Sequence, residues 1–192
     1  LEYSLTEESK TEAIEMMGKT SKVLLDQIMS FRNILSAESG DLEVQNSEIF
    51  SGHLIDEAIS LVSNNKSLNA TIVKDVNSEN VSLISDKLLV SRILVNMLKN
   101  AAEYENNPES IIQIGSKLTN TTIKFWVKNN GVIPEFAQKQ IFQRSFSTKG
   151  GNRGLGTYSM KLLGEKYLHG KVGFISNEID RTQFYIELPY KK

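Results

Sequence analysis

The first forty residues carry apolar side chains at helical spacing. Steps of three and four residues alternate through this stretch, at Ile14, Met17, Ser21, Leu24, Ile28, Phe31 and Leu35. Such a heptad seam is typical of a helix that packs against partner helices. Thr6 suits a helix start and Gly40 a helix end, so we expect one helix over residues 6–37. A helix packed on its own domain is the alternative, and the persistence of the seam favours a bundle helix.

Beyond residue 41, short alternating patterns and longer helical patterns predict an α+β domain. Strands are expected at 43–49, 70–76, 80–84, 110–118, 121–128, 171–177 and 182–188. Helices are expected at 53–64, 86–104, 135–142 and 155–168. Alternation of Ile123, Phe125 and Val127 with other residues predicts a sheet with one buried face. The last helix is expected to bury Leu155, Tyr158, Leu162 and Leu163.

Composition narrows the class of protein. The length of 192 residues suits one sizeable domain with an appendage. A net charge of −1 gives no global basic field, so no nucleic-acid partner is expected. The absence of cysteine excludes disulfides and thiolate metal sites, and no apolar run approaches the ~20 residues that span a bilayer. Because the chain starts at Leu1 rather than Met, we interpret it as a cytoplasmic fragment, or as the cytoplasmic end of a membrane sensor.

A lid expected over residues 130–156 has the composition of a phosphate-binding segment. Its glycines let the backbone approach phosphate oxygens without a Cβ in the way. They include Gly150, Gly151, Gly154 and Gly156. The helix that follows directs free N–H groups and its positive dipole end toward an anion. Arg144, Lys149 and Arg153 add positive charge, with solvated surface cations as the alternative.

The helix expected over 86–104 carries two asparagines one turn apart. Asn96 and Asn100 are four residues apart and therefore share a face. Amide oxygens of this kind suit a hydrated Mg²⁺ and its phosphates. Lys99 and Tyr104 flank the pair and would border a nucleotide. The alternative is that both asparagines are plain polar helix residues.

These stretches together resemble the ATP-binding domain of sensor histidine kinases, in the superfamily that includes gyrase B and MutL. The boxes of that family appear in order as NMLKNAAEY, VKNNGVIP, IFQRSFSTKG and RGLG. The resemblance covers roughly residues 24–190. It implies a two-layer α/β sandwich of the Bergerat type, preceded by a long bundle helix. Residues 1–40 would be the second helix of a dimerisation hairpin whose first helix is absent, and residues 41–192 the ATP-binding catalytic domain.

The function implied by this resemblance is that of a protein histidine kinase in a two-component system. The γ-phosphoryl group of ATP would pass to a histidine upstream of this chain, and from there to a response-regulator aspartate. ATP and Mg²⁺ are the implied cofactors. The implied partners are a response-regulator receiver domain and a second copy joined through the N-terminal helix. Neither His53 nor His169 stands in the usual acceptor motif.

The resemblance also assigns roles to particular residues. The implied catalytic residues are Asn96, Arg144 and Lys149, and the implied metal ligand is Asn100. The implied nucleotide contacts are Lys99, Asn100, Tyr104, Asn129, Gly131, Ile133, Phe146, Ser147, Thr148, Arg153, Gly154, Leu155, Gly156 and Thr182. Phe142 and Phe146 are interpreted mainly as packing residues of the lid.

The chain departs from the family at two positions near the adenine. Asn129 stands where the family has an aspartate, and Arg181 stands where its third glycine motif has a glycine. The amide oxygen of Asn129 can accept from an adenine amine, but the charge-assisted part of that bond is lost. We expect ATP binding to be weaker by ~1 kcal/mol.

Two other functions stay open from the sequence. The departures at Asn129 and Arg181 are compatible with a degenerate nucleotide-binding or dimerisation module without kinase activity. An ATP hydrolase of the gyrase type is the third possibility. Asn96 argues against it, because the hydrolysing members have a glutamate there and an amide cannot act as general base for water. Phosphoryl transfer depends mainly on positioning and charge neutralisation, which such a site can supply.

Overall fold

The computed structural model describes residues 6–64, 70–105, 107, 109–144, 146 and 155–190. It forms two compact units, Leu1–Leu42 and Glu43–Lys192. The first unit is the helix α1 (Glu7–Ser39) of 33 residues, in agreement with the helix predicted over 6–37. The hydroxyl of Thr6 accepts from the backbone N–H of Ser9 at 3.3 Å and caps its start. Gly40 ends it in the left-handed conformation, with φ at 89°.

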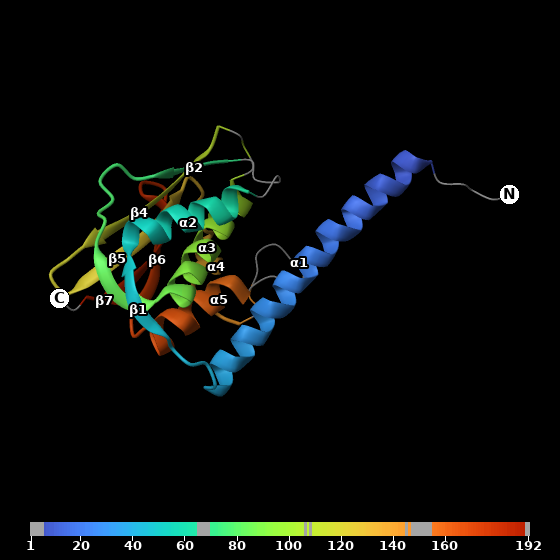
Figure 1. The fold of residues 1–192 in the computed structure, drawn as a ribbon. Coiled ribbons are helices and arrows are strands. Elements are labelled where there is room, and N and C mark those ends of the chain that lie inside the picture. Colours follow the sequence, from blue (N-terminus) through green and yellow to red (C-terminus); the bar gives the residue numbers. More distant parts are fainter. Residues whose placement is uncertain are drawn as a thin grey trace. The chain divides into compact units, whose positions relative to one another are not determined.

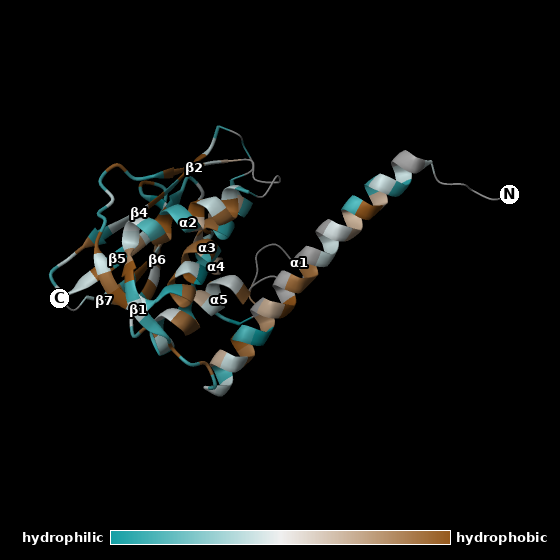
Figure 2. Ribbon diagram, viewed as in Figure 1, coloured by the Kyte–Doolittle hydropathy of each residue, from teal (hydrophilic) through white to brown (hydrophobic). Residues whose placement is uncertain are grey.

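The apolar seam of α1 is exposed along its length. The relative exposure of its apolar members runs from 44% at Leu35 to 69% at Ile14 and Met17. Hydrophobic residues recur along this helix in Figure 2. Because soluble proteins rarely leave a contiguous apolar stripe in water, this surface is suited to contact with another helix.

The second unit is a two-layer α+β sandwich, as predicted. Its sheet has the order β2 (Thr71–Lys74), β4 (Ile111–Leu118), β5 (Thr122–Asn129), β7 (Arg181–Pro189) and β6 (Lys171–Asn177). The pair β2–β4 is parallel and the other pairs are antiparallel. Helices α2 (Ser51–Ser63), α3 (Lys87–Tyr104) and α5 (Leu155–Lys161) lie over one face of this sheet (Figure 1). Strands β1 (Asn46–Phe50) and β3 (Ser82–Asp86) pair antiparallel and form a separate two-stranded sheet.

The sheet has one buried face, as the alternation predicted. Ile123, Phe125 and Val127 of β5 are buried beneath the helices. On the opposite face, aromatic rings lie across glycines of neighbouring strands. A Cβ at Gly115 would stand 2.8 Å from the Trp126 ring. The same relation holds between Gly173 of β6 and Tyr185 of β7, so half-buried rings cover the backbone of this outer face.

Helix α3 forms the centre of the helical layer. Its buried stripe consists of Leu89, Val90, Ile93, Leu94, Met97, Leu98 and Ala101. This stripe packs against α2, α5 and β5. The carboxylate of Asp86 caps the helix start by accepting from Leu89 N at 3.0 Å, and it also accepts from Gln45 N at 2.8 Å. The position of α3 is therefore fixed by both its apolar side and its N-terminus.

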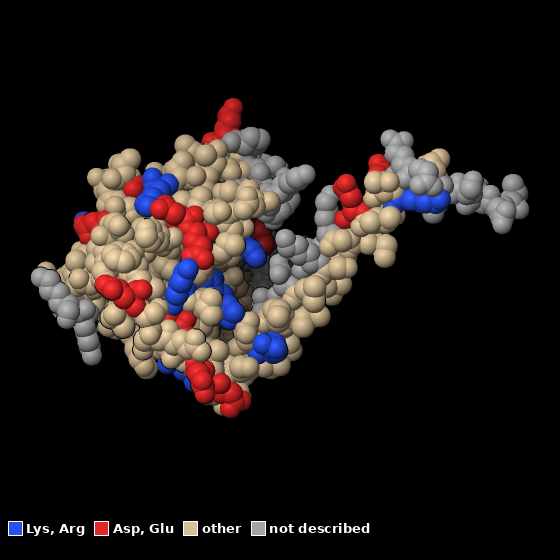
Figure 3. Space-filling model, viewed as in Figure 1, with Lys and Arg blue, Asp and Glu red and all other residues tan. Residues whose placement is uncertain are grey.

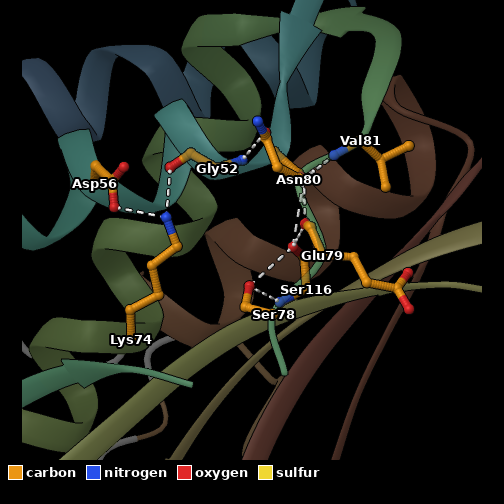
Figure 4. A network of polar contacts seen from close by, with 9 residues as sticks. Gly52, Asp56, Lys74, Ser78, Glu79, Asn80, Val81 and Ser116 are labelled. Atoms are coloured by element: carbon orange, nitrogen blue, oxygen red, sulfur yellow. Dashed lines mark hydrogen bonds and ion pairs between the residues drawn. The ribbon is translucent and has the colours of Figure 1, made fainter. Parts of the chain in front are cut away.

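A polar network fixes the start of α2 (Figure 4). The hydroxyls of Ser51 and Ser116 both donate to the carbonyl of Glu79, at 2.8 and 2.7 Å. The side-chain oxygen of Asn80 accepts from Gly52 N at 3.0 Å. These bonds join α2, the β2–β3 connection and strand β4, and they satisfy polar groups that the packing buries.

The structure corrects several sequence-based boundaries. The short helix expected over 135–142 ends early, as α4 (Glu135–Gln138). The helix expected over 155–168 is α5 followed by a π-helix, η1 (Leu162–Tyr167). Because a π turn is wider than an α turn, it shifts the buried face within Leu162–Tyr167. Leu163 is buried as expected, but Leu155, Tyr158 and Leu162 are only half-buried. The buried positions instead include Ser159, Met160, Gly164 and Tyr167.

Gly164 of η1 should tolerate no side chain. A Cβ there would lie 2.4 Å from Val172 Cγ2 and 3.0 Å from Ile186 Cδ1, inside the packed core. We expect Gly164→Ala to lower the free energy of unfolding by about 1–3 kcal/mol, because overpacking outweighs the gain in helix propensity. Urea unfolding followed by circular dichroism measures this change. Gly18→Ala is the matched control, since open space surrounds Gly18 in α1 and the same substitution should not destabilise. A Gly164→Ala protein as stable as the wild type would contradict this account of η1.

Candidate functional site

Polar side chains line one side of α3. Asn96 and Asn100 stand one turn apart as predicted, and Arg92 stands one turn earlier on the same line. All three are half-buried. Burial lowers the pKa of Arg92, and the nearby charge of Asp86 acts in the opposite direction. A guanidinium nevertheless stays charged in proteins, so this line carries one positive charge beside two amides.

Asn100 faces the first residues of α5. Its side-chain oxygen lies 3.6 Å from the point where a Cβ of Gly156 would stand. Its Nδ2 is buried and has no hydrogen-bond partner within the described part of the chain. A buried donor without a partner costs about 1–3 kcal/mol, so the fold alone does not favour an amide here. The arrangement suits a side chain that is kept for a ligand. We call Asn96, Asn100 and Gly156 the Asn100 end of the site.

A second group of polar residues lies at the ends of the central strands. Asn129 and Thr182 are direct partners across β5 and β7, with 5% and 3% exposure. The Thr182 hydroxyl lies 2.8 Å from the hydroxyl of Ser176, which also accepts from Ile133 N at 2.8 Å. The turn after β5 is thereby bonded to β6 and β7. We call Asn129, Thr182 and the turn of residues 130–133 the Asn129 end of the site.

The C-terminus of α3 covers this turn. The Tyr104 ring occupies the space above Gly131, where an added Cβ would come within 2.2 Å of it. With the ring in this position, only glycine fits beneath it. The next residue, Glu105, accepts from Asn130 N through Oε1 at 2.6 Å. Since Asn100 and Tyr104 are four residues apart on one helix, α3 connects the two ends of the site.

The root of the lid is held by aromatic and polar contacts. The Phe142 ring packs against Phe174 and Phe184, with centroids 5.8 and 6.3 Å apart, as its predicted packing role requires. The hydroxyl of Thr157 in α5 donates to the carbonyl of Ile141. Both flanks of the lid are thus attached to the sandwich.

The other predicted site residues differ in exposure, and some lie outside the described residues. Lys99 and Arg144 are exposed, and Phe146, Leu155 and Gly156 are half-buried. Five lie outside the described residues: Ser147, Thr148, Lys149, Arg153 and Gly154. The sequence interpretation missed Arg92, Glu105 and Ser176. Arg92 could have been found from its spacing to Asn96, whereas the contact of Ser176 depends on strand register.

Arg181 has an unusual backbone conformation. Its φ of 62° lies in the left-handed region, immediately before Thr182. A residue with a Cβ pays about 1–2 kcal/mol there, which explains why a glycine suits this position. An open hollow of about 380 Å³ lies at the same end of the sheet, and its lining includes Lys128, Asn129 and Arg181.

Surface charge and clusters of metal-binding side chains do not indicate a further site among the described residues. Lys and Arg are interspersed with Asp and Glu on the face shown in Figure 3. Groups of three or more His, Asp or Glu suited to a metal ion do not occur among the described residues, so the predicted Mg²⁺ ligand remains the Asn100 amide. None of the helices that the structure describes is long and apolar enough to cross a membrane.

Comparison with known proteins gives consistent relatives. Phytochrome B of Glycine max is 26% identical over 203 residues, which cover 97% of this chain and 17% of the phytochrome. The sensor protein VanS of Enterococcus faecium is 30% identical over 117 residues, covering 58% of this chain and 30% of VanS. The chain therefore spans about a sixth of the phytochrome and under a third of VanS.

Solved structures share the fold. The catalytic domain of the histidine kinase ThkA superposes with a TM-score of 0.66 at 26% identity, covering 77% of this chain and 99% of that domain. A structure of ThkA in complex with the response regulator protein TrrA covers 99% of this chain and 54% of that one, with a TM-score of 0.69 at 20% identity. At that identity the second likeness supports the fold alone.

The family match covers the candidate site. Residues 85–192, more than half of the chain, match the family described as histidine kinase-, DNA gyrase B- and HSP90-like ATPases. The matched region contains α3, the turn after β5, the lid and strand β7. The chain belongs to the family of histidine kinase-, DNA gyrase B- and HSP90-like ATPases.

Proposed function

We propose that this chain is the ATP-binding catalytic part of a two-component sensor histidine kinase. It transfers the γ-phosphoryl group of ATP to a histidine upstream of Leu1, and a response-regulator aspartate then receives it. The observation that carries the proposal is the buried Nδ2 of Asn100, which has no hydrogen-bond partner among the residues that the structure describes, and whose side chain faces Gly156 at the start of α5. An ATP site needs a polar group of this kind beside a backbone that can approach phosphate.

The Asn129 end receives the base in this proposal. The side chain of Asn129 makes no hydrogen bond within the described residues, so its amide is available to a ligand. Thr182 stands opposite it on β7 and stays bonded to Ser176. Tyr104, held over Gly131, provides an apolar wall beside the base.

The Asn100 end receives the phosphates. The amide oxygen of Asn100 is a hard ligand and would hold Mg²⁺. The ion, when bound, neutralises charge on the phosphate oxygens. Arg144, Lys149 and Arg153 are the proposed cationic contacts of the γ-phosphate, on the basis of their place in the sequence. Asn96 offers no general base for water, which favours transfer to an imidazole over hydrolysis.

Two protein partners are proposed for this chain. The exposed seam of α1 supports a homodimer through this helix. A cytoplasmic location is proposed from the match to the ATPase family. A response-regulator receiver domain is the proposed second partner. The complex of ThkA with the response regulator TrrA supports it, because ThkA shares the fold of this chain.

Phosphorylation of the protein with its upstream sequence restored tests the proposed function. We expect incubation with γ-labelled ATP and Mg²⁺ to produce an acid-labile label on a histidine. A folded protein that acquires no such label would contradict it. Undetectable Mg–ATP binding at millimolar ligand would instead favour the degenerate module, and steady phosphate release that Asn100→Ala abolishes would favour the hydrolase.

Asn100→Leu should separate stability from binding. Leucine has a similar shape and removes the unpaired donor, so the free energy of unfolding without nucleotide should stay equal or rise by about 1 kcal/mol. ATP binding measured by calorimetry should be lost. Asn80→Leu is the control, because that amide is bonded to Gly52 N and its loss should destabilise. Strong destabilisation by Asn100→Leu would show that the Asn100 amide is structural.

Asn129→Asp should strengthen ATP binding. A carboxylate at this position restores a charge-assisted bond to the adenine amine, which we expect to lower the Kd about fivefold to tenfold. Calorimetric titration with Mg–ATP measures this change. Asn120→Asp adds the same charge at the exposed turn before β5 and should leave the Kd unchanged. Equal affinities of Asn129→Asp and wild type would remove Asn129 from the base contact.

A further inference from the structure

Glu105 is a buried carboxylate at the C-terminus of α3. Its residue exposure is 8%, and its backbone N–H ends the helix by bonding to Ala101 O at 3.0 Å. A carboxylate is costly to bury unless hydrogen bonds compensate for the lost water. Helix formation alone therefore does not account for a buried carboxylate at this position.

One oxygen of Glu105 is firmly bonded. Oε1 accepts from the backbone N–H of Asn130 at 2.6 Å, a short distance of the kind found in charge-assisted hydrogen bonds. No ion pair or second hydrogen bond of Glu105 occurs among the described residues. A backbone amide thus binds one carboxylate oxygen, which leaves the other oxygen for water or another donor.

This bond acts on the turn that carries Asn129. The peptide bond between Asn129 and Asn130 is planar, so fixing the Asn130 N–H also fixes the carbonyl plane of Asn129. The same turn is held at Gly131 by the Tyr104 ring and at Ile133 by Ser176. The turn is therefore in contact with three side chains, of Glu105, Tyr104 and Ser176, and Glu105 is the charged one.

The charge lies within one residue of the amide that faces the base. In an interior of low dielectric, a carboxylate acts on neighbouring groups more strongly than in water. It attracts N–H groups and repels carbonyl oxygens. The amide of Asn129 can rotate to meet either kind of edge, and so it discriminates poorly by itself.

We propose that Glu105 is the specificity-determining residue at the Asn129 end, where it favours a purine that presents an amino group over one that presents a carbonyl oxygen. It supplies, from the end of α3, the negative charge that position 129 lacks. This inference rests on the proposed function, because the chain must bind a purine nucleoside triphosphate.

Adenosine and inosine triphosphates provide the test. Adenine presents an amino group at C6 and an acceptor at N1, whereas hypoxanthine presents a carbonyl oxygen at C6 and an N–H at N1, and the proposed role of Glu105 concerns the group at C6. The Kd of each Mg–nucleotide is measured by calorimetry for the wild type, Glu105→Gln and Glu105→Ala. Glu105→Gln keeps an oxygen that accepts from Asn130 N but removes the charge, so we expect it to reduce the preference for ATP about fivefold at nearly unchanged stability. Glu105→Ala should reduce both the preference and the stability.

Two further variants make the result specific. Glu79→Ala removes a comparable bond, from Glu79 Oε2 to Leu118 N at 2.7 Å, far from Asn129 in the sequence, and should leave the preference unchanged. Asn129→Asp placed in the Glu105→Gln protein should restore the preference, because the charge returns to the site. A wild type that binds neither nucleotide would overturn the proposed function. A wild type that binds ATP, with an unchanged preference in Glu105→Gln, would overturn the role of Glu105 alone.

Discussion

The burial of one face of α3 fixes the geometry of the whole site. Packing of this face against α2, α5 and β5 leaves the helix a single position over the sheet. Asn100 then meets Gly156, and Tyr104 and Glu105 meet the turn after β5. With a rise of about 1.5 Å per residue, the helix sets the spacing of these contacts at roughly 6–8 Å along its axis. A displacement of α3 would change both ends of the site together.

Buried polar groups of the second unit differ in how fully they are hydrogen-bonded. Around the start of α2, Ser51, Asn80 and Ser116 are bonded to backbone groups. At the site, Nδ2 of Asn100 has no partner among the described residues, and Arg181 adopts a left-handed backbone. Functional sites commonly retain such costs while the rest of the fold compensates. The contrast within one domain supports a ligand at α3 rather than at α2.

Local signals in the sequence predicted most of the helices and strands, because α3 and the β4–β5 hairpin depend on contacts close in the chain. The parallel β2–β4 pair and the β1–β3 sheet depend on distant partners and could not be derived from periodicity. No local pattern reveals the π turns of η1 or the close packing of Gly164 on Val172 within them. At the site, residue type indicated Asn100, whereas the bond of Ile133 to Ser176 joins residues 43 apart.

The exposed seam of α1 has a consequence for how the two units behave in solution. The sandwich buries a complete core of its own, whereas the seam residues of the helix remain in water, with 58% exposure at Ile28 and 45% at Phe31. Free energy from covering them is gained only on association, and so it obeys mass action. Dilution should therefore loosen the helix while the sandwich stays folded, and thermal melting should resolve a concentration-dependent step from a concentration-independent one.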